Sequence, residues 1–207
     1  MTTTPATSPL LDLSGLPRFD AIQPAHVEPA VRNLLEALRN TVERLQDDPA
    51  VPTWATFVEP IENESERLGR AWGIAVHMHS VMDTPEWREA YNAMLPEVTR
   101  FYAELGQNLK LFEKYKAIRN GAEFATLSPA RQRIIDNELR GFRLSGAELP
   151  DDQKPRFQAI QEEMASLGAK FSENILDATN AYAHIVTDEA EIKGLPADAI
   201  AAAREAA

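Results

Sequence analysis

The four histidines are the side chains of this sequence with the widest scope for metal and acid–base chemistry. None of them begins a His-Glu-x-x-His motif, and the nearest two are His77 and His79. Because residues two apart on a helix point about 200° away from each other, this pair cannot chelate one ion. We therefore expect His79 to pack inside the protein and His77 to face solvent, and we predict no metal ligand or cofactor in this chain.

Carboxylates and hydroxyls also lack a catalytic spacing. Glu62, Glu64 and Glu66 alternate along a predicted helix, which scatters them over different faces, and we interpret them as part of a solvated surface. The sequence holds no Gly-x-Ser-x-Gly frame for a serine nucleophile and no Gly-x-Gly-x-x-Gly phosphate loop. We accordingly predict no catalytic residue in this chain, and the pattern assigns no substrate-binding residue.

The charge balance and the absence of cysteine narrow the function classes further. The 32 acidic and 21 basic residues give a formal net charge of −11. An acidic surface repels phosphate backbones and anionic lipid, so we expect no nucleic acid partner and no membrane partner. The lack of cysteine excludes disulfides, thiol catalysis and thiolate–metal sites. The first residues lack the basic and apolar regions of a signal peptide, and we expect a cytoplasmic location.

The longest secondary-structure element that the sequence predicts is a single helix. Its apolar residues recur at steps of three and four, which is the spacing of one stripe on an α-helix. They are Phe157, Ile160, Met164, Leu167, Phe171, Ile175, Ala178 and Tyr182. We predict that this longest helix covers about residues 151–182, and we expect other parts of the chain to cover its stripe, because an isolated amphipathic helix is only marginally stable.

The remaining chain is predicted to be helical as well. Thr53, Thr84 and Ser128 precede apolar stripes and have the character of N-caps, and Pro60 is expected to kink or restart its helix. The first helical segment begins near residue 23 or at residue 29 and ends at about residue 46. The further ones are about 53–81, 84–120, 128–145 and 196–207. Residues 183–187 form at most one short strand. The fold class is therefore all-α, a multi-helix lobe with long amphipathic helices.

Several blocks of this sequence carry a resemblance to a known family, and they occur in one order along the chain. They are LPRFDAI (16–22), PAHVEPAV (24–31), RLGRAW (67–72), VMDTP (81–85), ELGQN (104–108), FRLSG (142–146) and the run from Lys170 to Tyr182. In that order they resemble the N-terminal part of the thimet oligopeptidase / oligopeptidase A family of zinc metallopeptidases. The resemblance covers about residues 9–207 and is strongest to the bacterial oligopeptidase A branch.

This resemblance implies a function for the parent protein. Family members are helical, have two lobes flanking a channel and cleave short peptides, with zinc held by His-Glu-x-x-His and a downstream glutamate in the C-terminal half. None of those zinc ligands occurs in this chain. The resemblance thus implies an N-terminal lobe at residues 16–207, truncated before the catalytic zinc domain. Residues 1–15 are rich in Thr, Pro and Ser, and we expect them to form a flexible N-terminus. The lobe would form a wall of the channel and be inactive without its catalytic partner domain.

Two further interpretations stay open from the sequence. The chain could instead be a free-standing helical module, derived from that lobe, that binds peptides or a protein. A weaker alternative is an unrelated helical scaffold, which the ordered blocks disfavour. The polar residues of the long helix are interpreted as helix-to-helix or lobe-to-lobe contacts, with a channel-facing role as the lesser alternative. They are Ser172, Glu173, Asn174, Asp177, Thr179 and Asn180.

Overall fold

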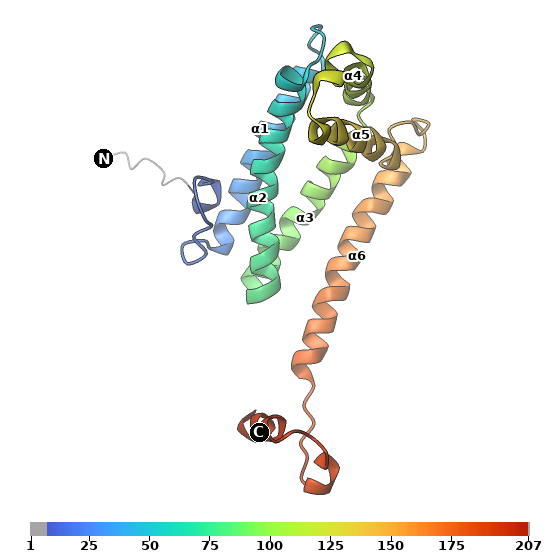
Figure 1. Cartoon of the computed structure of the whole chain (residues 1–207). Helices are drawn as coiled ribbons and strands as arrows, with labels where there is room; N and C mark the ends of the chain where they lie inside the picture. The colour runs from blue at the N-terminus through green and yellow to red at the C-terminus, as the bar shows by residue number, and fades with distance from the viewer. Residues whose placement is uncertain (1–7, 207) are drawn as a thin grey trace, which may run out of the picture. The chain divides into compact units, whose positions relative to one another are not determined.

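The computed structural model describes residues 8–206, and within this range the chain is helical with no strand (Figure 1). The predicted all-α class is therefore confirmed. The helices are α1 (Val27–Gln46), α2 (Glu59–Met82), α3 (Pro85–Gly106), α4 (Leu109–Asn120), α5 (Pro129–Leu144), α6 (Lys154–Ala181) and α7 (Ala197–Ala206). The chain divides into two units at Leu167 and Gly168. None of the helices in the described range is long and apolar enough to cross a membrane.

Polar caps start the helices where the sequence predicted them. The side chain of Thr84 accepts a hydrogen bond from the Trp87 amide, and Ser128 accepts one from Arg131. These bonds satisfy amide groups that have no partner inside the first helical turn. Thr53 also caps as expected, but the segment after it is a π-helix at Trp54–Val58, and α2 restarts at Glu59 with Pro60 in its first turn.

The predicted segment 84–120 is two helices rather than one. Helix α3 ends at Gly106, and α4 begins at Leu109. Asn108 caps α4, because its side-chain oxygen accepts a hydrogen bond from the Leu111 amide at 3.1 Å. Its amide group also donates to Gln46 Oε1 at 2.7 Å, which ties the break to the end of α1. The sequence prediction missed this break because the apolar spacing continues across it.

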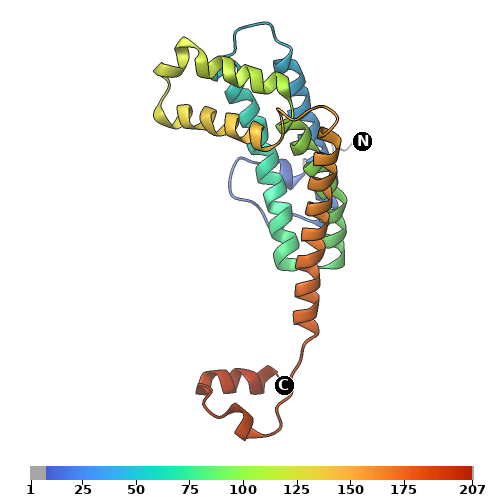
Figure 2. The ribbon, with the colours of Figure 1, turned by 90° about the vertical axis from the view of Figure 1, so that its right-hand side faces the viewer.

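Helices α1, α2 and α3 pack side by side, and α4 and α5 form a pair at the end where α1 finishes and α2 begins (Figures 1 and 2). Asp83 adopts a left-handed conformation, with φ of 45°, and turns the chain from α2 into α3. The larger fully buried side chains of this core are Phe112, Leu10, Leu34, Leu38, Leu68, Met94, Leu111, Ile118 and Ile135.

The residues before α1 also contact this core. Leu10 is fully buried within a 3₁₀-helix at Pro9–Leu11. The guanidinium group of Arg70 on α2 donates to the carbonyl oxygens of Leu13 at 3.1 Å and Gly15 at 2.9 Å. The predicted flexibility of residues 1–15 stays a prediction, and residues 1–7 lie outside the described residues.

The long helix α6 is found close to its expected bounds, but its apolar stripe is not covered as we expected. In the first unit, Ile160, Met164 and Leu167 are 39%, 63% and 58% exposed. A salt bridge joins this part of α6 to α3, with Arg100 Nε 3.0 Å from Glu162 Oε1. The spacing of apolar residues predicted the helix correctly, because that spacing is a local property of the chain. Burial of the apolar stripe depends instead on which other parts of the protein pack against it.

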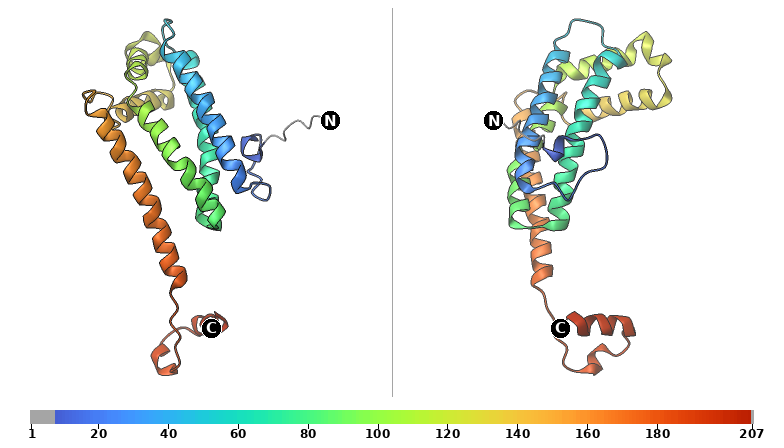
Figure 3. Two further views of the ribbon diagram at one scale, coloured as in Figure 1. Left: turned by 180° about the vertical axis from the view of Figure 1, so that it is seen from behind. Right: turned by 90° about the vertical axis from the view of Figure 1, so that its left-hand side faces the viewer.

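In the second unit, α6 continues to Ala181, and Phe171 and Ile175 of the same stripe are 67% and 51% exposed. Residues 182–188 follow as an extended run without strand pairing. The sequence allowed at most one short strand at 183–187, and the extended alternative is the one observed. A 3₁₀-helix at Glu189–Ile192 and the helix α7 complete the described part of this unit (Figure 3).

Candidate functional site

A cavity of about 380 Å³ lies among α2, α3, α4 and α5 in the first unit. Its polar lining comes from all four helices: Glu62 and Ser65 on α2, Tyr102 on α3, Tyr115 on α4 and Glu138 on α5. Apolar side chains such as Ile61, Leu111 and Phe142 form the rest of its wall. In this acidic cavity, titratable groups meet in a partly desolvated space.

The two carboxylates of the acidic cavity are half-buried. Burial raises the pKa of Glu62 above its ordinary value. Burial also raises the pKa of Glu138, and the negative charge of Glu62 raises it further. Within residues 8–206, neither carboxylate has a cation or a hydrogen-bond donor that would stabilise its charged form. The cavity therefore holds two desolvated carboxylates that repel each other.

Glu62 corrects our interpretation of the alternating glutamates as solvated surface. Glu64 pairs with Arg67 at 3.0 Å and Glu66 lies 3.8 Å from Arg70, so these two fit that interpretation. Glu62 instead directly follows the buried Ile61 and lines the cavity. Periodicity could have signalled this, since a residue beside the buried stripe of a helix lies at the edge of the core.

Glu138 was not singled out from the sequence at all. It lies next to the buried residues Ile135, Leu139 and Phe142 of α5, which mark the face of that helix that packs inward. That position signals partial burial. The approach of Glu138 to Glu62, however, follows from the packing of α5 near α2, which no local pattern in the sequence reveals.

The buried residue Tyr115 also lines this cavity. Its side chain is only 2% exposed, and its ring packs edge-on against Phe57 at 5.3 Å and tilted against Phe142 at 5.6 Å. Burial raises its pKa, and the charges of Glu138 and Glu62 add to that effect, which places the hydroxyl near both carboxylates. Among the described residues, no hydrogen-bond partner satisfies this hydroxyl.

The histidines are placed largely as the sequence predicted. His77 is exposed, with its ring 5.6 Å from that of Phe19. His79 is half-buried and stacks on Tyr91 at 4.3 Å, and Tyr91 in turn stacks on Trp72 at 5.1 Å. No three His, Asp or Glu side chains in the described range are grouped so that they could hold a metal ion.

Two of the polar side chains of α6 bond within their own helix. Ser172 Oγ donates to the Gly168 carbonyl at 3.1 Å, and Thr179 Oγ1 donates to the Ile175 carbonyl at 2.8 Å. Both hydroxyls are thus satisfied by the backbone of their own helix. A contact role for these residues toward another helix or lobe stays a prediction.

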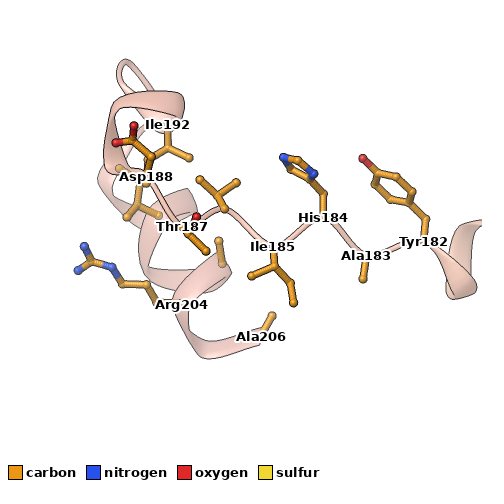
Figure 4. A pocket seen from close by; sticks show the side chains of 12 residues that line it. Tyr182, Ala183, His184, Ile185, Thr187, Asp188, Ile192, Arg204 and Ala206 are labelled. Atoms are coloured by element: carbon orange, nitrogen blue, oxygen red, sulfur yellow. The ribbon is translucent and has the colours of Figure 1, made fainter.

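A second cavity, of about 570 Å³, lies within the second unit (Figure 4). The extended run at 182–188 and helix α7 provide most of its lining, including His184, Asp188 and Arg204. Much of the wall is open to solvent, since Tyr182 and Ile185 are 75% and 78% exposed. Solvent screens charged groups in such a space, so the acidic cavity of the first unit is the stronger candidate site.

Comparison with known proteins assigns the chain to a family. The family profile described as "Neurolysin/Thimet oligopeptidase, N-terminal domain" matches residues 31–154, more than half of the 207 residues. The chain belongs to this family. The acidic cavity is thus a feature of a neurolysin/thimet oligopeptidase N-terminal domain, and the resemblance found in the sequence is confirmed.

Curated relatives of this neurolysin/thimet oligopeptidase family member include oligopeptidases A. Oligopeptidase A of Haemophilus influenzae is 39% identical over 201 residues, which are 97% of this chain and 29% of that protein. Oligopeptidase A of Escherichia coli is 40% identical over 96% of this chain and 29% of its own length. A probable cytosolic oligopeptidase A of Arabidopsis thaliana is 39% identical over 98% of this chain and 29% of its length. The chain therefore spans less than a third of the length of these relatives.

Proposed function

We propose that this chain is the N-terminal lobe of a zinc-dependent oligopeptidase that hydrolyses short peptides, and that it forms one wall of the substrate channel. The observation that carries the proposal is the match of 96–98% of this chain to 29% of the length of each of three proteins named oligopeptidase A. In this proposal, zinc and the residues that activate water lie in a C-terminal catalytic domain, and the present chain contributes peptide recognition but no catalytic group.

The exposed stripe of α6 supports a contact with such a catalytic domain. Ile160, Met164 and Leu167 present large apolar surfaces to solvent. Apolar residues that are exposed together often mark an interaction surface, because burying them is favourable. In the parent enzyme, we propose that this stripe is covered by the catalytic domain.

Hydrolysis by the purified chain tests the proposal. We expect no cleavage of a quenched short peptide by residues 1–207, with or without added zinc. Zinc-dependent cleavage by the chain alone would overturn the assignment of catalysis to another domain. Sequencing the gene beyond codon 207 is the complementary test, and we expect a continuation that encodes His-Glu-x-x-His.

A free-standing binding module is the second candidate, and the acidic cavity is the observation that favours it. Such a module would bind peptides through Glu62 and Glu138 without any metal. A natural stop codon directly after residue 207, together with peptide binding by the chain, would favour the module over the oligopeptidase lobe.

We also propose a cytoplasmic location for the parent enzyme. The names of two Arabidopsis thaliana relatives differ on this point, since one is called cytosolic and another chloroplastic/mitochondrial. Cell fractionation followed by immunoblotting tests the proposal, and recovery of the protein in an organelle or membrane fraction would contradict it.

A further inference from the structure

The acidic cavity leaves two negative charges without a counter-charge. A half-buried carboxylate loses part of its hydration, and proteins usually offset that loss with a cation or with hydrogen-bond donors. Glu62 and Glu138 receive neither from the described residues. Three basic side chains of the surrounding helices pair elsewhere: Arg67 with Glu64, Lys116 with Glu113, and Arg143 with Glu148.

Tyr115 provides a second, independent indication that the cavity is built for a ligand. Its side chain is only 2% exposed and lines the cavity, and its hydroxyl group has no hydrogen-bond partner among the described residues. Because no protein group among the described residues satisfies this hydroxyl, it is available to hydrogen-bond a ligand in the cavity. The hydroxyl oxygen can accept a hydrogen bond, as can all four carboxylate oxygens.

The hydrogen-bond acceptors of this cavity therefore favour a ligand group that is positively charged and has several hydrogen-bond donors. A guanidinium group carries five N–H donors in a planar fork, and this geometry suits acceptors that come from several directions. Here the acceptors lie on α2, α4 and α5, so a fork matches them better than the compact charge of an ammonium group. The rings of Tyr102 and Phe142 in the same wall offer apolar contact for the stem and for the flat guanidinium face.

The volume of the cavity is compatible with one such side chain. At about 380 Å³ it lies in the range of roughly 300–1,000 Å³ that is usual for ligand pockets. The net charge of −11 adds a long-range attraction for cationic ligands.

We propose that the acidic cavity binds the arginine side chain of a short peptide through Glu62, Glu138 and the Tyr115 hydroxyl. This inference rests on the proposed role of the chain in handling peptides. The same guanidinium chemistry could come from an arginine of a second copy of the chain, and the experiment distinguishes the two sources.

Peptide binding by the chain of residues 1–207 tests this inference. Fluorescence anisotropy compares a labelled hexapeptide that carries one arginine with the same peptide carrying citrulline, which has the shape of arginine but no charge. We expect the citrulline peptide to bind at least about tenfold more weakly, because charge-assisted hydrogen bonds are lost. Equal affinity for the two peptides, or no binding of the arginine peptide, would overturn the inference.

Matched variants locate the binding. Glu138→Gln and Glu62→Gln keep the shape of each side chain and remove its charge, so each is expected to weaken binding of the arginine peptide about tenfold and to abolish the preference over citrulline. Glu163→Gln is the control, since Glu163 is an exposed glutamate of α6 away from the cavity. Far-UV circular dichroism checks that all three variants are folded. A preference for arginine that survives in Glu138→Gln would refute the assignment.

Two further outcomes separate this inference from its alternatives. Sedimentation that shows a dimer of the unmodified chain, lost in the Glu62→Gln/Glu138→Gln double variant, would assign the cavity to a second copy and overturn the peptide proposal. Equal binding of both peptides would overturn the arginine inference alone. The proposed oligopeptidase function would stand in that case, because the hydrolysis and reading-frame tests judge it separately.

Discussion

Gly106 at the end of α3 and Ser145 just after α5 approach so closely that a Cβ atom at position 106 would lie 2.5 Å from the Cβ of Ser145. Both residues line the acidic cavity, so this contact sets how near α3 and α5 come at its wall. Only glycine leaves room for such an approach without moving one of the two segments. The shape of the cavity thus depends on a residue that carries no side chain.

Gly106→Ala is predicted to destabilise the protein by about 1–3 kcal/mol, because the added methyl group must displace Ser145. Urea unfolding followed by circular dichroism measures this change. The control is Gly69→Ala on α2, where a Cβ would meet nothing within 4 Å. That control should stabilise by about 0.5–1 kcal/mol, since alanine favours a helix interior over glycine. A neutral Gly106→Ala would show that the contact is looser than described.

Removing the hydroxyl of Tyr115 is predicted to leave stability unchanged or to raise it by up to about 1 kcal/mol. In Tyr115→Phe the ring contacts to Phe57 and Phe142 remain, whereas a hydroxyl group that has no hydrogen-bond partner among the described residues disappears. Removing the ring as well, in Tyr115→Ala, should cost about 3–5 kcal/mol. Thermal unfolding compares the two variants. A loss of 1 kcal/mol or more in Tyr115→Phe would mean that the hydroxyl has a partner in the folded chain.

The carboxylates of the acidic cavity are predicted to make the chain less stable as pH rises. Their pKa values are higher in the folded than in the unfolded state, so the folded state binds protons more tightly. This contribution is fully present below the ordinary glutamate pKa of 4.5 and is lost as pH rises through the raised folded values. The double variant Glu62→Gln/Glu138→Gln lacks it.

Urea unfolding at several values from about pH 4 to about pH 7 measures this difference. Relative to the unmodified chain, the double variant should gain stability toward neutral pH. Comparing the two proteins cancels the opposite contribution of carboxylates such as Glu97 and Glu162, whose pKa values are lowered by Arg32 and Arg100. Parallel pH profiles for the two proteins would contradict the prediction.

Thr84→Ala is predicted to cost about 1 kcal/mol of unfolding free energy, because the Trp87 amide at the start of α3 loses its side-chain acceptor. Chemical denaturation provides the measurement. Thr99→Ala inside the same helix is the control, and we expect it to change stability by less than about 0.5 kcal/mol. Equal losses in the two variants would mean that the cap contributes nothing specific.

Local features of this fold were predictable from the sequence, and the reason is physical. A cap such as Thr84 or Ser128 acts on amides within three residues, so the relevant interaction is contained in a short stretch of chain. The helix α6 was predictable for the same reason, since its spacing of apolar residues is a local property. The break between α3 and α4 was missed, although Asn108 is a good cap, because the apolar spacing runs across it.

The acidic cavity depends on contacts between distant parts of the chain. Glu62 and Glu138 belong to helices α2 and α5, and they come together only when the α4–α5 pair packs near α2 and α3. Spacing along one helix could place each residue beside a buried stripe, but it could not pair them. The family resemblance predicted the lobe correctly and said nothing of this cavity, because it rests on the order of sequence blocks and not on a site.

The most direct test of our account is a titration of the two cavity carboxylates by NMR, with and without the arginine peptide. The account predicts that the pKa values of Glu62 and Glu138 fall when the peptide is added, since a bound guanidinium stabilises both charges, and that the citrulline peptide leaves them raised. Unchanged titration curves in the presence of saturating arginine peptide would contradict it.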